Sequence, residues 1–311
     1  MQTREWAETF HDERETAEDV LTLRAGKIIA CSTLRRVRHP LAGEKCFVDG
    51  GPVFESDADF AEHLRDLLSA TSDCVYLRLR PYLSAGEGAR VREVLRDHGF
   101  EFPAGQEQSG YVNTLLLDLT RPMSDLENDF SSHLRRNLRR ASRTELSVGR
   151  AVDAATAREF AHLLARVAKT AGYDVPPAER VAAFIANFCM ADSRDGALFC
   201  ASESGRIRAG IVVLRAGHSL VYHWGAREDS VEDHAPLAHA LHLQAMAWGQ
   251  ELGYQQYDFG GLFSAEGASG IDRFKRSFGG RVEAWFGEAI RRRGLRGWLA
   301  GRRRAPAIQG A

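Results

Sequence analysis

The chain has 311 residues, of which 44% are hydrophobic, enough for one large core or two medium ones, and this excludes a largely disordered protein. Lysine and arginine together number 41 against 42 acidic residues, so the formal net charge is only -1 and excludes a strong overall attraction to polyanions. No window approaches the roughly 20 apolar residues of a membrane-spanning helix, and the first residues lack the apolar stretch of a signal peptide. We therefore expect a cytoplasmic protein.

Alternating strand and helix patterns fill the first part of the chain and predict a first lobe over residues 1–123. The expected elements are strands at 19–31 and 45–54, a helix at 57–70, a strand at 74–79, a helix at 86–98 and a strand at 114–119. The five cysteines are scattered and form no Cys-x-x-Cys pair, which favours a reducing compartment and buried thiols over a disulfide framework.

A basic segment follows at 129–143, where Arg135, Arg139 and Arg143 recur at i, i+4 and i+8. On a helix these arginines form one stripe. Arginines also concentrate at 291–304, whereas acidic residues dominate 228–233, so a polyanion would bind locally.

The same alternation continues and predicts a second lobe over 124–288, with a basic tail or helix over 289–311. Its expected elements are helices at 154–171, 177–190 and 236–252 and strands at 197–203, 207–215, 219–224 and 254–259. The segments 26–30 and 205–209 both close a hairpin after a glycine, which is weak evidence for a duplicated lobe. Both lobes indicate an α/β protein with mixed sheets (α+β).

Three motifs lie in the last third of the chain: Tyr257-Asp258-Phe-Gly-Gly261, then Phe274-Lys275-Arg-Ser-Phe278, then Gly287-Glu288. In this order and spacing the chain resembles the FemABX family, whose second lobe carries Tyr-Asp-x-Gly-Gly, Phe-Lys-x-x-Phe and a Gly-Glu strand end. Further agreement comes from Trp6-Ala7, Gly51-Pro52-Val53 and the strand 115–119. The resemblance spans nearly the whole chain.

The resemblance implies two tandem GNAT-like acyltransferase lobes that move an amino acid from aminoacyl-tRNA to an amine. It implies no metal and no cofactor beyond aminoacyl-tRNA as co-substrate. In the family the lysine of the Phe-Lys pair is thought to stabilise charge at the ester carbonyl, and here that residue is Lys275. Lysine occurs only four times, so a lysine within an arginine-rich segment favours this role over a solvated surface position.

Other site candidates surround these motifs. Tyr222 and Trp224 alternate with His223 on a predicted strand, so we expect the two aromatic rings to share one face, either lining the acceptor site or belonging to the core. Asp258 could orient the amine or bond to the glycine amides that follow it. The candidate residues are Lys275, Tyr222 and Asp258 for catalysis, Phe274, Trp224, His223 and Tyr257 for substrate binding, and Arg135, Arg139, Arg143, Arg302, Arg303 and Arg304 for tRNA binding.

The chain departs from the family where its members bind the phosphates of the peptidoglycan precursor. Phe10 stands where a lysine is expected, and a Thr, Arg and Tyr become Asp174, Pro176 and Arg180. In addition, Arg80-Pro81 replaces an Asp-Pro that has been considered as a catalytic acid in the family. The acceptor is therefore expected to be another small amine, such as a specialised metabolite of the antibiotic type.

Three alternatives stay open. A peptidoglycan-bridge aminoacyltransferase has the same motifs. An acyl-CoA-dependent N-acyltransferase of the GNAT superfamily has the same lobes, but the acidic segment 228–233 would repel CoA phosphates at the helix start. A non-enzymatic RNA-binding module would need the arginines but not the motifs. His234, His239 and His242 lack the pattern of a metal site and are interpreted as helix-face residues.

Overall fold

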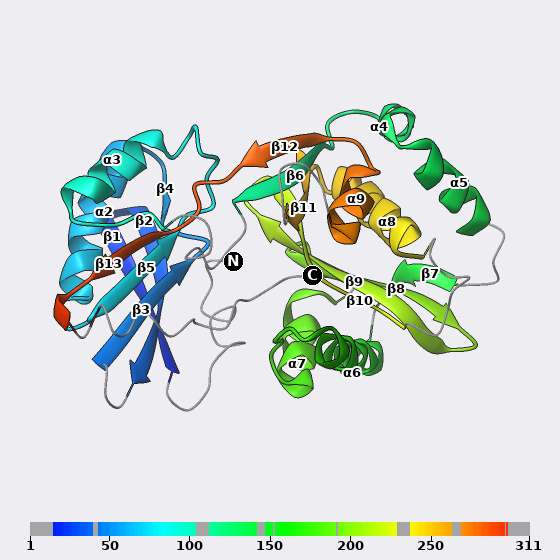
Figure 1. Cartoon of the computed structure of the whole chain (residues 1–311), viewed down its shortest axis with the longest axis horizontal. Helices are drawn as coiled ribbons and strands as arrows, with labels where there is room; N and C mark the ends of the chain where they lie inside the picture. The colour runs from blue at the N-terminus through cyan, green and yellow to red at the C-terminus, as the bar shows by residue number, and fades with distance from the viewer. Residues whose placement is uncertain are drawn as a thin grey trace. The chain divides into compact units, whose positions relative to one another are not determined.

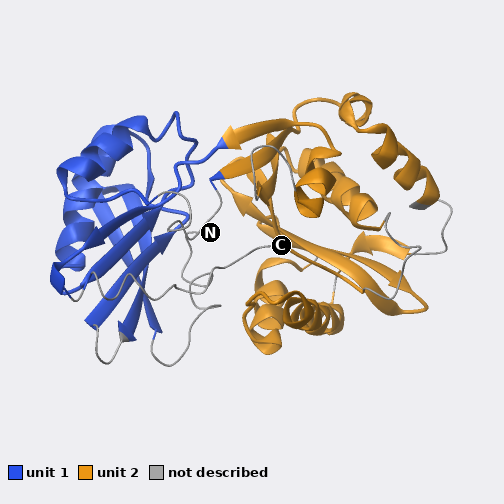
Figure 2. Cartoon of the chain, viewed as in Figure 1, with its two compact units in different colours: residues 1–112, 284–307 blue, residues 113–283, 308–311 orange. Residues whose placement is uncertain are grey.

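The computed structural model describes residues 15–39, 43–103, 112–141, 147–151, 153–190, 192–228, 237–262, 269–295 and 297. The chain divides into two units, drawn in different colours in Figure 2. Unit 1 comprises residues 1–112 and 284–307, and unit 2 comprises residues 113–283 and 308–311.

Unit 1 is a mixed sheet with two helices against it (Figure 1). The sheet order is β1-β2-β3-β5-β13, and β4 pairs with β2. The strands are β1 Glu15–Arg24, β2 Lys27–His39, β3 Gly43–Asp49, β4 Val53–Phe54, β5 Tyr76–Arg80 and β13 Ala289–Arg292, and the helices are α2 Asp57–Ala70 and α3 Ala89–Asp97. Phe60 and Leu64 of α2 pack with Leu34, Val48 and Leu79 of the strands to form the core.

The helix predicted at 57–70 is confirmed as α2. It begins at Asp57 because the Ser56 side chain caps its start by accepting a hydrogen bond from the Asp59 amide. The two predicted hairpin turns have matching backbones. Ala25 and Gly26 have φ of 51° and 78°, and Ser204 and Gly205 have 51° and 77°. Two successive positive φ angles define the tight turn that suits the right-handed twist of a hairpin.

The chain returns to unit 1 through β13, where the sequence had indicated a basic tail or helix. β13 pairs antiparallel with β5, and Ala289 and Ile290 are buried. Arg291 and Arg292 therefore alternate along a strand. The sequence did not predict this strand, because only two apolar residues, Ala289 and Ile290, precede the arginines.

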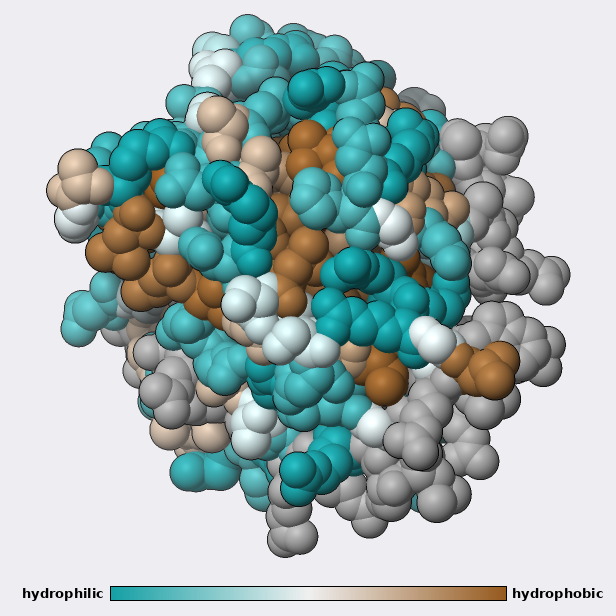
Figure 3. Space-filling view, turned by 90° about the vertical axis from the view of Figure 1, so that its left-hand side faces the viewer, coloured by the Kyte–Doolittle hydropathy of each residue, from teal (hydrophilic) through white to brown (hydrophobic). Residues whose placement is uncertain are grey.

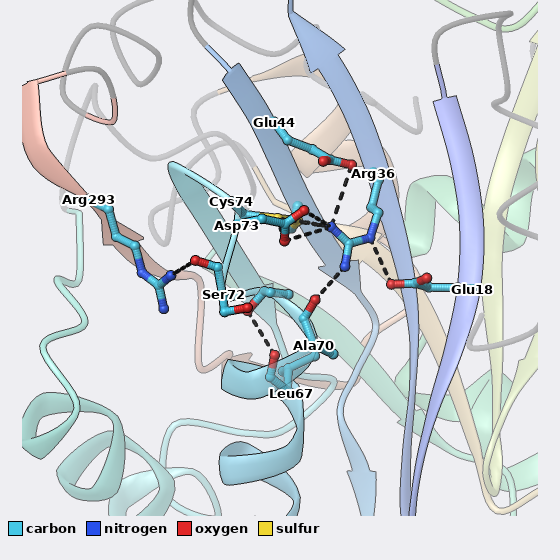
Figure 4. Close-up of polar contacts among 11 residues, drawn as sticks. Glu18, Arg36, Glu44, Leu67, Ala70, Ser72, Asp73, Cys74 and Arg293 are labelled. Carbon is cyan, nitrogen blue, oxygen red and sulfur yellow. Dashed lines mark hydrogen bonds and ion pairs between the residues drawn. A yellow bond between two sulfur atoms is a disulfide. The ribbon is translucent and has the colours of Figure 1, made fainter.

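The expectation that all five cysteines are unpaired is wrong, because Cys46 and Cys74 form a disulfide. Cys46 lies in β3, and Cys74 precedes β5, the parallel neighbour of β3. This pairing of strands brings together two residues 28 positions apart, which spacing alone did not reveal. The Arg36 guanidinium lies 3.3 Å from the Cys74 sulfur and is surrounded by Glu18, Glu44 and Asp73 (Figure 4).

Unit 2 is a seven-stranded sheet covered on both faces. The strand order is β12-β6-β11-β10-β9-β8-β7. Its strands are β6 Asn113–Asp118, β7 Ser147–Arg150, β8 Gly196–Glu203, β9 Arg206–Ala216, β10 Ser219–Arg227, β11 Gln256–Gly261 and β12 Arg281–Ala284. Its helices are α4 Met123–Asp129, α5 Ser132–Ala141, α6 Ala154–Ala171, α7 Ala178–Phe188, α8 Leu237–Glu251 and α9 Gly270–Arg276. Helices α8 and α9 lie on one face, and α6 and α7 lie on the other (Figure 1).

The strand predicted at 114–119 exists as β6, but it belongs to unit 2 rather than to the first lobe. β6 pairs antiparallel with β11, and Leu115 and Leu117 lie in the core beneath α8. The family resemblance had already placed this segment just before the arginine-rich helix. β6 belongs to unit 2 because it pairs with β11, more than 130 residues later in the chain, and the local sequence pattern of a strand does not show which strand it pairs with.

Large apolar side chains remain exposed on unit 1. Leu21, Leu23, Ile28 and Val53 belong to the neighbouring strands β1, β2 and β4. Figure 3 shows apolar side chains gathered between hydrophilic ones on the face that it draws. Within the described part of the chain, no helix combines the length and apolar character needed to cross a membrane.

Candidate active site

The candidate site begins where β10 and β11 separate. These parallel strands pair only from Ser219 to Val221 and from Gln256 to Asp258. At this point β11 contains Gly260 with φ of 71°, and a Cβ there would lie 3.3 Å from the Tyr222 carbonyl oxygen. Only glycine fits both the backbone angle and the close approach without strain. Gly260, the first glycine of the Tyr-Asp-x-Gly-Gly motif, therefore allows the backbone arrangement at which β10 and β11 separate.

A bulge in β10 changes the faces of the aromatic residues. Tyr222 pairs with Val213 but Trp224 pairs with Val212, so His223 is an inserted residue. Tyr222 consequently faces α8, while the Trp224 ring packs on Phe184 of α7. The prediction that Tyr222 and Trp224 share a face is wrong, because one extra residue reverses the alternation. His223 lies beside Trp224, and burial lowers the pKa of His223 to about 3.

Lys275 is buried, with 2% of its surface exposed. It lies in the short helix α9, whose start Ser269 caps through the Asp272 amide. The Lys275 ammonium donates a hydrogen bond to the Gly261 carbonyl oxygen at 2.7 Å and lies 5.8 Å from the Tyr222 ring centroid. Burial lowers the pKa of Lys275 to about 8, against the opposing effect of Asp258 and Asp272. At neutral pH the side chain is therefore mainly a buried cation.

Asp258 is held by the glycines and by β6. Its Oδ1 atom accepts hydrogen bonds from the Gly260 amide at 2.8 Å and from the Thr114 hydroxyl. The same hydroxyl lies 2.8 Å from the Gly260 carbonyl oxygen, and it can donate to one acceptor at a time. The bond to the Gly260 amide matches the structural role considered for Asp258. The three proposed catalytic residues thus meet at one place.

Replacing Thr114 with valine should destabilise unit 2 by about 1–3 kcal/mol, because the buried Asp258 carboxylate loses a donor and valine keeps the shape. Thr120→Val is the matched control, since Thr120 also donates to an aspartate, Asp118, but is exposed. The free energy of unfolding in urea measures both. Equal losses in the two variants would contradict the importance of the buried bond.

A set of aromatic rings surrounds His242 of α8. The His242 Nδ1 atom lies 2.7 Å from the Tyr257 hydroxyl, and both residues are buried. The rings around it belong to Tyr222, Tyr257, Phe259, Phe274 and Phe278. Sequence reasoning placed His242 on a helix face without a role. Its position among Leu241 and Ala245 on the apolar side of α8 was the available signal.

Two of the arginines proposed for tRNA binding lie on α5. Arg135 and Arg139 are exposed, while Leu134 packs in the core beneath them. The others, Arg143, Arg302, Arg303 and Arg304, lie outside the described residues, as do Phe10 and His234.

The altered Arg80 position has a structural explanation. Arg80 forms an ion pair at 3.4 Å with Glu288, the acid of the Gly-Glu motif, and Glu288 is buried. Arg78 and Asp49 complete this group, and Asp49 lies 2.9 Å from Arg78. An arginine in place of the family's acid is therefore compensated by carboxylates within unit 1.

Comparison with known proteins identifies the fold. A family model described as an acetyltransferase (GNAT) domain matches residues 128–276. Among solved structures, FemX aligns with a TM-score of 0.78 and 17% identity over 93% of this chain and 91% of FemX. L-PGS from Bacillus licheniformis aligns at 0.58 with 14% identity over 92% and 88%, and a tandem GNAT protein from the clavulanic acid biosynthesis pathway at 0.53 with 13% identity over 92% and 85%. A search of curated proteins finds no match.

These findings confirm the predicted fold. The chain is mixed α/β, has two GNAT-like lobes and is Fem-like in structure. Unit 2 holds the segment matched by the GNAT model, and that segment contains Tyr222, Asp258 and Lys275.

Proposed function

We propose that this protein is a Fem-type aminoacyltransferase that moves an amino acid from aminoacyl-tRNA to an amine of a small acceptor. The GNAT domain model and the FemX-like fold support an acyltransferase. The observation that carries the proposal is the buried Lys275 ammonium beside Tyr222, where β10 and β11 separate. The Gly261 carbonyl oxygen and the carboxylates of Asp258 and Asp272 balance this buried charge and keep it at a fixed place.

The chemistry requires stabilisation of negative charge. The amine nitrogen of the acceptor attacks the ester carbonyl carbon, and the carbonyl oxygen becomes an oxyanion. The carbon–oxygen bond to the tRNA ribose then breaks, the ribose oxygen takes a proton, the amine loses one, and an amide remains. A positioned ammonium in a largely dry site stabilises the oxyanion far better than it would in water. Lys275 is the group in this role.

Other proposed contacts come from residues near Lys275. Phe274 lies on the same helix and packs on His239, with ring centroids 4.7 Å apart. The Trp224 ring packs on Phe184 of α7 with His223 beside it, so these two sequence-predicted residues are not among the contacts near Lys275. Tyr257 is fully buried with its hydroxyl bonded to His242, so it acts through its neighbours.

The acceptor we propose is a specialised metabolite rather than the peptidoglycan precursor. The positions that the resemblance assigns to phosphate binding are changed at Phe10, Asp174, Pro176 and Arg180. The structural likeness to a protein of the clavulanic acid pathway is consistent with such an acceptor. Peptidoglycan-bridge synthesis is the second candidate, favoured by the likeness to FemX.

Acyl-CoA is the alternative acyl donor. The segment that would hold its pyrophosphate begins at Glu228, which is bound by Arg206 and Arg208, and it continues through residues outside the described part. Three further acids follow at Asp229, Glu232 and Asp233. Negative charge near a helix start opposes phosphate binding there.

We expect purified protein, charged total tRNA, radiolabelled amino acids and candidate amines to give product that RNase abolishes. Acetyl-CoA in RNA-free protein should give no product, because the acidic segment disfavours CoA. The Lys275→Met variant, assayed in the same way, is the control for catalysis by the enzyme itself. Robust acylation from acetyl-CoA without RNA would replace this proposal by the CoA-dependent alternative.

A further inference from the structure

Four side chains from four elements of unit 2 form a continuous series of contacts. The Tyr257 hydroxyl on β11 lies 2.7 Å from Nδ1 of His242 on α8. The His242 ring contacts the Tyr222 ring of β10 edge to face, with centroids 4.7 Å apart and planes at 75°. The Tyr222 ring lies 5.8 Å from the Lys275 ammonium on α9. A change at Tyr257 can therefore reach Lys275 through two intervening rings.

The hydrogen bond with the Tyr257 hydroxyl determines which tautomer His242 adopts. Tyr257 is fully buried, and among the described residues His242 is its hydroxyl's hydrogen-bonding partner. A buried hydroxyl proton without an acceptor costs about 1–3 kcal/mol, so the hydroxyl donates to Nδ1. The proton of the neutral imidazole then resides on Nε2. Burial, reinforced by Lys275 and His239, lowers the pKa of His242 well below its ordinary value, so the ring is neutral.

The surrounding rings restrict movement of His242. Phe259, Phe274 and Phe278 lie with centroids 5.0, 5.5 and 5.6 Å from the His242 ring. Interiors are packed as densely as organic crystals, so the ring cannot turn without displacing its neighbours. His242 is therefore a rigid support with one orientation.

Charged groups reach Lys275 from several elements. Asp258 on β11 and Asp272 on α9 favour its ammonium form, and the Gly261 carbonyl oxygen accepts its hydrogen bond. From α8, a protonated His242 would repel the ammonium, whereas the neutral ring does not. Because the His242 ring is neutral, it can lie near the Lys275 ammonium without electrostatic repulsion.

We propose that His242, oriented by the Tyr257 hydroxyl, is a positioning residue: it holds the Tyr222 ring, and this ring holds the Lys275 ammonium in place. The effect on catalysis rests on the proposed function. The position of the Lys275 ammonium does not depend on the proposed function, and it can be measured without substrate.

Tyr257→Phe tests the proposal, because it removes the hydroxyl and keeps the ring. Tyr254→Phe is the matched control, since it deletes another buried tyrosine hydroxyl, bonded to the Arg194 carbonyl oxygen outside the contact series. Protein labelled with carbon-13 at lysine Cε gives one NMR signal for each of four lysines. The Lys275 signal is the one absent from Lys275→Met.

In Tyr257→Phe we expect the Lys275 signal to move and its titration midpoint to rise from about 8 by roughly half a pH unit or more, because looser packing admits water to the ammonium. His242→Phe, which removes the acceptor and keeps a ring, should act in the same direction. Tyr254→Phe should change neither signal nor midpoint. In the transfer assay, kcat should fall about 5-fold to 10-fold at unchanged KM.

An unchanged Lys275 signal and midpoint in both Tyr257→Phe and His242→Phe would overturn the positioning role. Equal shifts in Tyr254→Phe would also overturn it, by showing a general loss of packing. If Lys275 responds as expected but wild-type protein transfers no amino acid from tRNA, the positioning role stands and the proposed function fails.

Discussion

Lys275→Met should lower the rate of aminoacyl transfer about 100-fold to 1000-fold, the loss that follows removal of one oxyanion donor. Methionine fills nearly the same space but carries no charge, so the site keeps its shape and loses its cation. The measurement is single-turnover transfer from charged tRNA. Lys169→Met is the matched control, because Lys169 is exposed on α6. Near wild-type turnover in Lys275→Met would remove Lys275 from the mechanism.

The stability of the same variant relative to wild type should depend on pH. Burial lowers the pKa of Lys275 from 10.5 to about 8, so folding opposes the charged form. This cost is fully present below about pH 8 and disappears as the pH rises toward 10.5, where the unfolded chain also loses the proton. The stability of wild type relative to Lys275→Met should therefore rise between about pH 8 and pH 10.5. Chemical denaturation at several pH values measures this.

The active form of Lys275 predicts the pH dependence of transfer. Because the ammonium is the stabilising group, the rate should fall as the pH rises through about 8. Lys275→Met should lack this fall, and a fall of the same size in that variant would show that another group controls the rate.

Local signals predicted the elements well. The helix at 154–171 coincides with α6, whose start is capped by Asp153 and whose end is Gly172 with φ of 75°. Capping residues and apolar periodicity are local, so they appear in the sequence. The motif resemblance also selected Lys275 and Asp258, which the structure brings close enough to interact although they lie 17 positions apart in the sequence.

Features that depend on distant contacts were not predictable in this way. The bulge at His223 inserts one residue, and strand alternation read along β10 could not detect it. The pairing of His242 with Tyr257 needs α8 to pack on β11, and the Cys46–Cys74 disulfide needs β3 beside β5. Each follows from tertiary neighbours rather than from spacing.

The arginines of α5 provide the second large effect. If Arg135 and Arg139 contact phosphates of a tRNA duplex, each contact releases counterions and contributes about 0.9 to the slope of log affinity against log salt. At roughly 0.1 M salt this is nearly tenfold in affinity per contact. Replacing both by glutamine should therefore weaken tRNA binding on the order of 50-fold and flatten the slope by nearly 2, while KM for the amine stays unchanged.

The control for this prediction is the pair Arg158→Gln and Arg194→Gln, which removes the same charge from exposed positions elsewhere on unit 2. A competing interpretation assigns the α5 arginines to ion pairs with Glu127 or Asp129. If Arg139→Gln lowers the melting temperature and leaves the salt slope unchanged, the arginines of α5 stabilise the fold and tRNA binds elsewhere.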